Sequence, residues 1–539
     1  MFRKILISII LVGVVFAATI RTLPPAALQA DVPANEFSAG RAVEAILAIA
    51  QSPRLVGSPA YEKAAEYVFA QLTALGLKPE TQKTTLDGVE VENILGRLEG
   101  SSTSEAILLM AHLDSVPVTP GAMDDASGVA TVLETVRALQ AGPKVGNTII
   151  VLITGPEENC CYGAKAFATK HPWARNVRLV INVDAGGVSG PSILAATGPD
   201  EGWLIRELAG VLPDPVASSA IEALGSPATD YTLELRKDGF SGIDFNLSWT
   251  KRIHTPLDNV DHINPASIQH QGEHMLAVAR RFGNLSLDFP NETRPIYFDI
   301  LGITIVYYPV TWAIPVLLGL SLVMGAVLIL GFKRKYLTTR GIGYGALSLV
   351  LSILTVPLLL ALVQWAILRP LLAAQPASNL SEGLIGDSLL SNSIRWGSAV
   401  LTLVSTVLWY GLFNKVKRVG WNDLVVGAYL FLYIGAFGTS LALPALSYIL
   451  VWPLLFGAIV AMVRFAWIAL KMHEPGWLTL LGSGITAVIA IVLFVPGILI
   501  AMLSIDIRMI YLVPVFVAAL AGFMVAPLGM LVTGTKLSQ

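Results

Sequence analysis

The sequence predicts an α/β domain, with a mainly parallel or mixed sheet sandwiched by helices, followed by an all-α membrane domain. Helical patterns alternate with short apolar runs over 36–290, which is typical of a sheet covered by helices. Long apolar runs dominate 300–539. Charged residues make up only 14% of the 539-residue chain, against about 25% in an ordinary soluble domain. We therefore expect part of the chain to lie in lipid.

The first segment, 1–25, has the pattern of a signal peptide or of an uncleaved signal anchor. Arg3 and Lys4 precede an apolar run, as in segments that direct export. The pair Ala17-Ala18 is a poor cleavage site, so we favour an N-terminal signal anchor. In either case we expect the domain that follows to be exported.

The α/β domain is predicted over 36–290 from two periodicities. Apolar residues at helical spacing mark helices that pack on a core, and short continuous apolar runs mark strands buried on both faces. The predicted helices cover 39–50, 61–75, 126–140 and 265–281, and the predicted strands cover 106–113, 147–154, 177–183 and 240–249.

The membrane domain is predicted over 300–539, with about seven transmembrane helices. Each apolar run is long enough to cross the hydrocarbon core, which takes about 20 helical residues. Basic residues collect in alternate connectors, near 333–340, 415–418 and 464–471. The positive-inside rule places these connectors in the cytoplasm and the α/β domain on the extracytoplasmic face, periplasmic or lumenal. The runs cover 308–332, 341–368, 395–413, 422–441, 444–466, 476–503 and 509–532.

Charge and cysteine content exclude several classes of protein. The net charge is −2, so there is no basic field to attract a nucleic acid, and the expected partner of the apolar half is the lipid bilayer. Cys160 and Cys161 are adjacent, and neighbouring cysteines rarely pair, so we expect no disulfide framework. No His-Asn pattern accompanies them, so we expect packed or idle thiols rather than nucleophiles.

Histidines and carboxylates follow the predicted strands of the α/β domain. Active sites of open α/β sheets lie at the carboxyl ends of the strands, so these side chains are expected at one edge. Two histidines with several carboxylates and no thiolate are a ligand set for Zn²⁺, Co²⁺ or Mn²⁺. The candidate residues are His112, Asp114, Asp124, Glu157, Glu158, Asp184 and His254.

The order of these motifs resembles the co-catalytic zinc aminopeptidase family, which includes leucyl aminopeptidases and is kin to glutaminyl cyclases. The resemblance covers about 40–285 and implies a zinc exopeptidase fold. The appended spans are similar to the branch of endoplasmic reticulum metallopeptidase and vacuolar membrane protease. The motifs are H-x-D from His112, GAMDDASG at 121–128, PEE at 156–158, NVD at 182–184 and IHTPLD at 253–258.

The resemblance implies a site for two zinc ions per chain. It implies that His112 and Asp184 bind one ion, that Glu158 and His254 bind the other, and that Asp124 bridges both. Three carboxylates and a bridging hydroxide balance the charge of two Zn²⁺ ions. Zinc lowers the pKa of bound water to about 7, so hydroxide is available at neutral pH.

The resemblance also implies two catalytic residues beside the ligands. Glu157 is implied as the general base, which passes the water proton to the leaving amine. Asp114 is implied to orient the histidine two residues before it. We expect a substrate-pocket or structural role for Asp230. The sequence departs from the family pattern at Cys160, where glycine is usual, and this departure could alter the turn near the metals.

Other polar residues have simpler interpretations. Asp125 is expected to cap the helix that begins near residue 126. His270 and His274 lie four residues apart with Glu273 between them, without the glutamate placement of a zincin motif, so we expect a solvated helix face.

The function implied by the resemblance is that of a membrane-anchored zinc exopeptidase, an aminopeptidase that acts on peptides. Three alternatives stay open: a glutaminyl cyclase-like acyltransferase on the same scaffold, a non-catalytic peptide-binding membrane scaffold, and a transporter with an accessory domain. Scarce ionisable residues in the spans disfavour the transporter.

Overall fold

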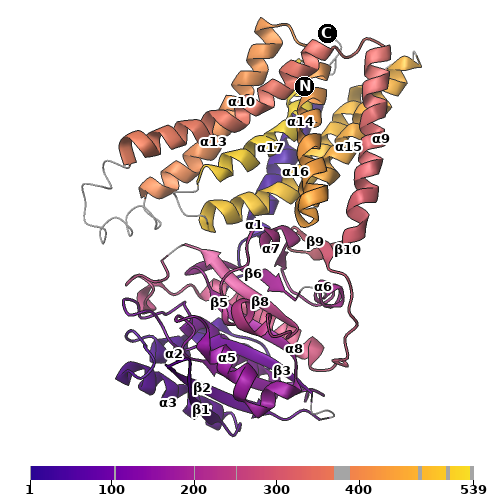
Figure 1. The fold of residues 1–539 in the computed structure, drawn as a ribbon. Helices are drawn as coiled ribbons and strands as arrows, with labels where there is room; N and C mark the ends of the chain where they lie inside the picture. Colours follow the sequence, from indigo (N-terminus) through magenta and orange to yellow (C-terminus); the bar gives the residue numbers. More distant parts are fainter. Residues whose placement is uncertain are drawn as a thin grey trace. The chain divides into compact units, whose positions relative to one another are not determined.

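The chain forms two compact units, which we call the α/β unit, Arg21–Tyr307, and the helical unit, Met1–Ile20 with Tyr308–Gln539. Figure 1 shows the elements of both units, coloured along the sequence. The computed structural model describes residues 2–101, 105–198, 201–250, 252–368, 389–470, 476–504 and 510–533.

The α/β unit contains an eight-stranded mixed sheet, in the order β1-β2-β4-β3-β5-β8-β6-β7. The central strands β4, β3, β5 and β8 are parallel to one another. Strand β1 pairs antiparallel with β2, β2 with β4 and β6 with β8, whereas β7 is parallel to β6. This arrangement confirms the predicted α/β class. The strands are β1 Glu80–Leu86, β2 Val89–Leu98, β3 Ala106–His112, β4 Thr148–Thr154, β5 Val177–Ala185, β6 Ser189–Thr197, β7 Val216–Ala217 and β8 Gly242–Trp249.

Helices cover both faces of this sheet, so its central strands are buried on both sides (Figure 1). On β3, Ile107 and Leu109 belong to the core shared with α2, α3, α4 and α8, whereas Leu108 and Met110 belong to the core shared with α5. Polar groups on the central strands are therefore favoured at the strand ends. The helices are α2 Ala39–Ile49, α3 Pro59–Ala74, α4 Ala126–Gln140, α5 Tyr162–Lys170, α6 Gly202–Ala209, α7 Ser219–Leu224 and α8 Pro265–Phe282.

The predicted strands and helices all form within two residues of their expected bounds, but the sequence analysis did not predict β1, β2, β6, β7, α5, α6 or α7. Strand β1, with the sequence ETQKTTL, is polar and lies at the edge of the sheet, so it lacks an apolar period. Asp87 and Gly88 both have positive φ and join β1 to β2, as a two-residue hairpin turn requires.

Six helices in the described part of the helical unit are long and apolar enough to cross a membrane. They correspond to the first six predicted runs. Two shorter apolar helices, Ile5–Arg21 and Leu512–Pro527, coincide with the expected N-terminal anchor and with the seventh run. That these two helices cross the membrane stays a prediction, and so does the orientation of the spans. Residues 471–475, within one basic connector, lie outside the described residues. The helices are α1 Phe2–Arg21, α9 Ala313–Lys333, α10 Thr339–Val363, α13 Leu389–Val416, α14 Trp421–Ala442, α15 Pro444–Ala469, α16 Gly476–Ser504 and α17 Leu512–Thr533. A short hairpin of β9 Pro295–Ile300 and β10 Thr304–Pro309 precedes α9.

A buried carboxylate ties α4 to α2. Glu134 Oε1 accepts hydrogen bonds from Arg41 Nε at 2.8 Å and from the backbone amide of Ser38 at 3.1 Å, and Glu134 Oε2 accepts from Arg137 Nε at 2.6 Å. The carboxylate of Glu134 therefore serves two partly buried guanidinium groups and the backbone of Ser38, which caps α2. This contact fixes the helix whose N-terminus carries the candidate site.

We expect Glu134→Ala to lower the free energy of unfolding by about 2–3 kcal/mol, because two arginines lose a buried partner. Pulse proteolysis of the purified full chain in urea measures the loss. The matched control is Glu66→Ala on α3, an exposed side chain whose removal changes stability by no more than about 0.5 kcal/mol. Equal losses in the two variants would contradict the role given to Glu134.

Candidate metal centre

The predicted ligands meet at the carboxyl edge of the parallel strands. Strand β3 ends at His112, β5 carries Asp184 near its end, and β4 and β8 run into the loops that hold Glu158 and His254. Asp124 lies just before α4, and its peptide bond to the next residue is cis. Parallel strands end side by side, so residues far apart in the sequence converge here.

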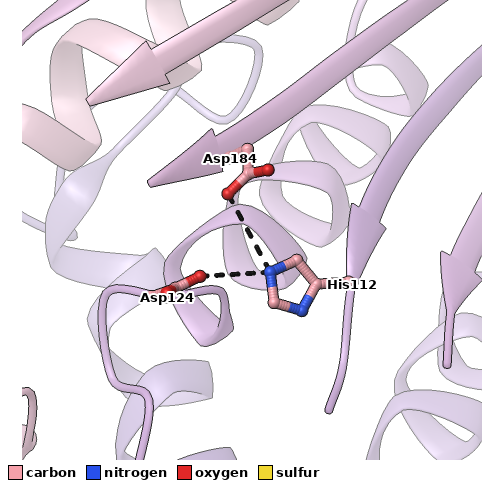
Figure 2. Close-up of side chains that lie close together, drawn as sticks. All are labelled: His112, Asp124 and Asp184. Atoms are coloured by element: carbon pink, nitrogen blue, oxygen red, sulfur yellow. Dashed lines mark hydrogen bonds and ion pairs between the residues drawn. The ribbon is translucent and has the colours of Figure 1, made fainter. Parts of the chain in front are cut away.

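One group of ligand atoms comes from His112, Asp124 and Asp184, and all three side chains are buried. His112 Nε2 lies 3.1 Å from Asp124 Oδ1 and 3.9 Å from Asp184 Oδ1 (Figure 2). The three atoms lie within 4.8 Å of one another, so a single metal ion can be coordinated by all three.

A second group shares Asp124 with the first and adds Glu158 and His254. His254 Nε2 lies 3.2 Å from Asp124 Oδ2 and 3.1 Å from Glu158 Oε2. Asp124 therefore turns one oxygen toward each imidazole, as a bridging carboxylate does. Glu158 Oε1 is buried and has no hydrogen-bond partner among the described residues.

The charges of the site favour a cation between its carboxylates. Burial opposes a charge on His112, but the charge of Glu157 and hydrogen bonds to Asp114 and Asp124 raise its pKa well above the usual value. Hydrogen bonds to Asp124 and Glu158 raise the pKa of His254 to about 10. Without a metal, protons on the imidazoles thus compensate these carboxylates. A divalent ion can replace those protons, because it binds the deprotonated imidazole nitrogen and supplies positive charge to the same carboxylate oxygens.

Asp114 holds the loop that carries the two glutamates. Its Oδ1 accepts the backbone amide of Glu157 at 2.9 Å and its Oδ2 accepts that of Glu158 at 3.1 Å. The Nδ1 atom of His112 lies 3.1 Å from the carbonyl oxygen of Asp114 and 3.6 Å from its carboxylate. The backbone of Asp114 therefore contacts the histidine more closely than the side chain does, and its carboxylate positions both glutamates.

Asp125 caps α4, as the sequence predicts. Its Oδ1 accepts the amide of Gly128 at 3.0 Å, and its Oδ2 accepts the amide of His112 at 3.3 Å. The cap therefore also connects the N-terminus of α4 to the end of β3.

The sequence analysis did not identify two buried residues that shape the Asp124 loop. Asp258 accepts the backbone amides of Met123 at 2.7 Å and Asp124 at 3.1 Å, one on each carboxylate oxygen. The guanidinium of Arg54 donates to the carbonyl oxygens of Leu113, Pro120 and Gly121. Asp258 ends the IHTPLD motif, so its position gave a signal. Arg54 begins the run RLVGSPAYEKAAEYV at 54–68, which the resemblance to the family includes, but nothing local indicates that its side chain is buried, because arginines in loops are ordinarily exposed.

The prediction for His270 and His274 is wrong. Both side chains are buried, because this face of α8 packs on β6 rather than facing water. His270 and His274 contact the backbone amide and the hydroxyl of Ser192 at 3.2 and 3.0 Å, and the carbonyl oxygens of Asp214 and Pro213 at 3.0 and 2.8 Å. Burial lowers the pKa of His270 to about 4, so the ring is neutral. The pair joins the 213–214 loop to β6.

Glu157 belongs to a further cluster of potential metal ligands. Glu157, Cys161 and Asp230 each place one potential ligand atom within 4.8 Å of the others. Burial raises the pKa of Glu157 well above its ordinary value and raises that of Asp230 to about 7. Asp230 is therefore a neighbour of the implied general base.

Comparison with known proteins supports a peptidase domain on this scaffold. Residues 93–279 match the sequence model of Peptidase family M28. The chain is 33% identical over 255 residues to endoplasmic reticulum metallopeptidase 1 of Mus musculus, covering 45% of this chain and 28% of that protein. It is 31% identical over 231 residues to a vacuolar membrane protease of Candida dubliniensis, covering 41% and 24%. In both cases the chain spans less than a third of the relative.

Among the solved structures that the chain matches is a Zn-dependent exopeptidase from Parabacteroides distasonis. Its sequence is 20% identical, the alignment covers 46% of this chain and 98% of that one, and the TM-score is 0.37.

We expect Asp258→Asn to weaken metal retention about tenfold, because the amide offers one acceptor oxygen where the carboxylate offers two to the Asp124 loop. The measurement is the zinc content of the purified chain, by mass spectrometry, after dialysis against graded chelator. The matched control is Asp261→Asn, an exposed carboxylate three residues away. Equal retention in both variants would show that Asp258 does not support the site.

Proposed function

We propose that this chain is a membrane-anchored zinc-dependent exopeptidase, an aminopeptidase that removes N-terminal residues from peptides. The observation that carries the proposal is the carboxylate of Asp124, which faces His112 with one oxygen and His254 with the other. The match to Peptidase family M28 and the metallopeptidase relatives support the same chemistry.

The donor atoms fit two zinc ions. Each group offers an imidazole nitrogen and carboxylate oxygens, which zinc accepts. His112 and Asp184 would hold one ion, Glu158 and His254 the other, and Asp124 both. When bound, zinc polarises a carbonyl and lowers the pKa of water to about 7. The buried Glu158 Oε1, which lacks a hydrogen bond from any described residue, is a further donor for the second ion.

Glu157 acts as the general base in this proposal. Its backbone is fixed by Asp114, so the carboxylate is held on the loop that also carries the ligand Glu158. Burial raises the pKa of Glu157 well above its ordinary value, and a raised pKa makes a carboxylate a stronger base. The carboxylate takes the proton of the attacking water and delivers it to the leaving amine.

An exopeptidase needs to recognise a free N-terminal ammonium group. Glu157 and Asp230 are carboxyl groups outside the proposed ligands of the two zinc ions, so a positively charged end of a peptide is favoured over an internal amide. We propose that this site lies on the extracytoplasmic face, which the basic connectors between the spans support.

We expect Glu157→Gln to lower kcat for aminoacyl-fluorophore hydrolysis by about 10²–10⁴-fold, because the amide cannot accept the water proton. The metal content should not change. Chelation should abolish the activity of the unmodified chain, and added zinc should restore it. The matched control is Glu66→Gln, an exposed residue. Activity that survives both the substitution and chelation would overturn the proposal.

The products distinguish an aminopeptidase from a cyclase on the same scaffold. We expect peptides with N-terminal glutamine to release free glutamine, detected by mass spectrometry, because hydrolysis cleaves the first peptide bond. Loss of ammonia with the peptide bond intact would identify cyclisation instead. Retention of an unchanged peptide by the metal-loaded chain would identify a binding scaffold.

A further inference from the structure

Three potential metal ligands, apart from the five predicted ones, meet at the loop between β4 and α5. Glu157 follows β4, Cys161 directly precedes α5, and Asp230 directly precedes the π-helical turn Tyr231–Leu235. Each offers one ligand atom within 4.8 Å of the other two. Cys161 and Asp230 are buried, whereas Glu157 is partly exposed. Two segments of the chain, the loop between β4 and α5 and the residue before the π-helical turn, therefore converge on one small volume.

Asp230 has an unsatisfied oxygen atom. The residue is 2% exposed, and its Oδ2 accepts a hydrogen bond from Thr154 Oγ1. Its Oδ1 is buried without a hydrogen-bond partner in the described part of the chain. A buried acceptor left unpaired is costly, and the cost is higher beside a second carboxylate. A cation would satisfy this oxygen and offset the repulsion between Asp230 and Glu157.

The spacing of the thiol and the glutamate suits a metal. Cys161 Sγ lies 3.5 Å from Glu157 Oε1. Two ligands of a tetrahedral zinc ion, bound at about 2.3 Å through sulfur and about 2.1 Å through oxygen, are separated by about 3.6 Å. Only small side-chain movements are thus needed for both atoms to reach one ion.

We propose that Glu157, Cys161 and Asp230 form a third cation site, which takes a thiophilic divalent ion, Zn²⁺ or Cd²⁺. The ion binds the sulfur as thiolate, and the thiol proton leaves to solvent. Sulfur makes this site chemically distinct from the two predicted zinc positions, whose donors are nitrogen and oxygen.

Occupation of this site inhibits the enzyme, and this part of the inference rests on the proposed function. An ion bound to Glu157 holds the electron pairs with which the carboxylate accepts the water proton. Excess zinc therefore competes with the base function, although the first two ions are required for activity. The inhibition should be relieved by removing the thiol without removing the base.

The test titrates Cd²⁺ into the purified, zinc-loaded full chain and records thiolate-to-cadmium charge-transfer absorption. The chain has two cysteines, and nitrogen and oxygen ligands do not produce this band. We expect the band in the unmodified chain and in Cys160→Ala, whose thiol is exposed and adjacent. We expect its loss in Cys161→Ala and in Cys161→Ser, and at least tenfold weaker binding in Asp230→Asn.

Either of two results would overturn the site: no band in the unmodified chain, or a band that follows Cys160 instead of Cys161. The Cys161→Ser variant keeps the side-chain size, and its circular dichroism shows whether the loss of binding reflects unfolding. In the kinetic arm, excess zinc should lower kcat/KM at least tenfold in the unmodified chain and Cys160→Ala, but not in Cys161→Ala. Absence of any peptidase activity would refute the proposed function, whereas the absorption arm would still decide the site.

Discussion

The carboxylate of Asp124 is the contact on which the rest of the site depends. Its two oxygens face two imidazoles that are separated by more than a hundred residues of sequence. This position requires a fixed backbone, which Asp258 supplies by accepting the amides of Met123 and Asp124. Asp125 then fixes the next turn by capping α4 and accepting the amide of His112. The carboxylates of Asp258 and Asp125 thus position the carboxylate of Asp124, and they do so through hydrogen bonds to the backbone rather than through side-chain packing.

The sheet explains why this machinery lies at one edge. Strands β3, β4, β5 and β8 are parallel and covered by helices on both faces, so their interiors accommodate apolar side chains. The candidate ligands lie at the ends of these strands, where loops supply backbone donors, whereas the buried Asn182 and Asp244 inside β5 and β8 satisfy each other with a hydrogen bond. Each of these parallel strands therefore adds a functional group to the same edge, and α4 and α8 pack on one face of the sheet.

The fold and ligands were predictable from the sequence where local pattern and long-range structure agree. Strand β3 is a continuous apolar run that ends in a histidine, so both the strand and His112 were evident. Strand β1 was not, because its polar residues belong to an edge and its identity depends on pairing with β2. Asp258 lies in a motif that the sequence shows, but its hydrogen bonds to the Asp124 loop, like those of Arg54, join distant segments and are not encoded by local spacing. His270 and His274 were misinterpreted because polar residue types were given more weight than their position, whereas tertiary packing buries both against β6.

The buried carboxylates of the site repel one another, and this repulsion links folding to cation binding. Asp114, Asp124 and Asp184 are buried within a small region, with Glu157 and Glu158 beside them. Burial lowers the pKa of the Arg54 guanidinium to about 10, so it remains charged at neutral pH. Its hydrogen bonds go to the carbonyl oxygens of Leu113, Pro120 and Gly121 rather than to these carboxylates. Protons or metal ions therefore balance the remaining charge. Since an unfolded chain does not assemble these ligands, every ion bound here also stabilises the fold. The same excess of buried negative charge that favours a metal ion on each side of Asp124 also favours a further cation between Glu157, Cys161 and Asp230.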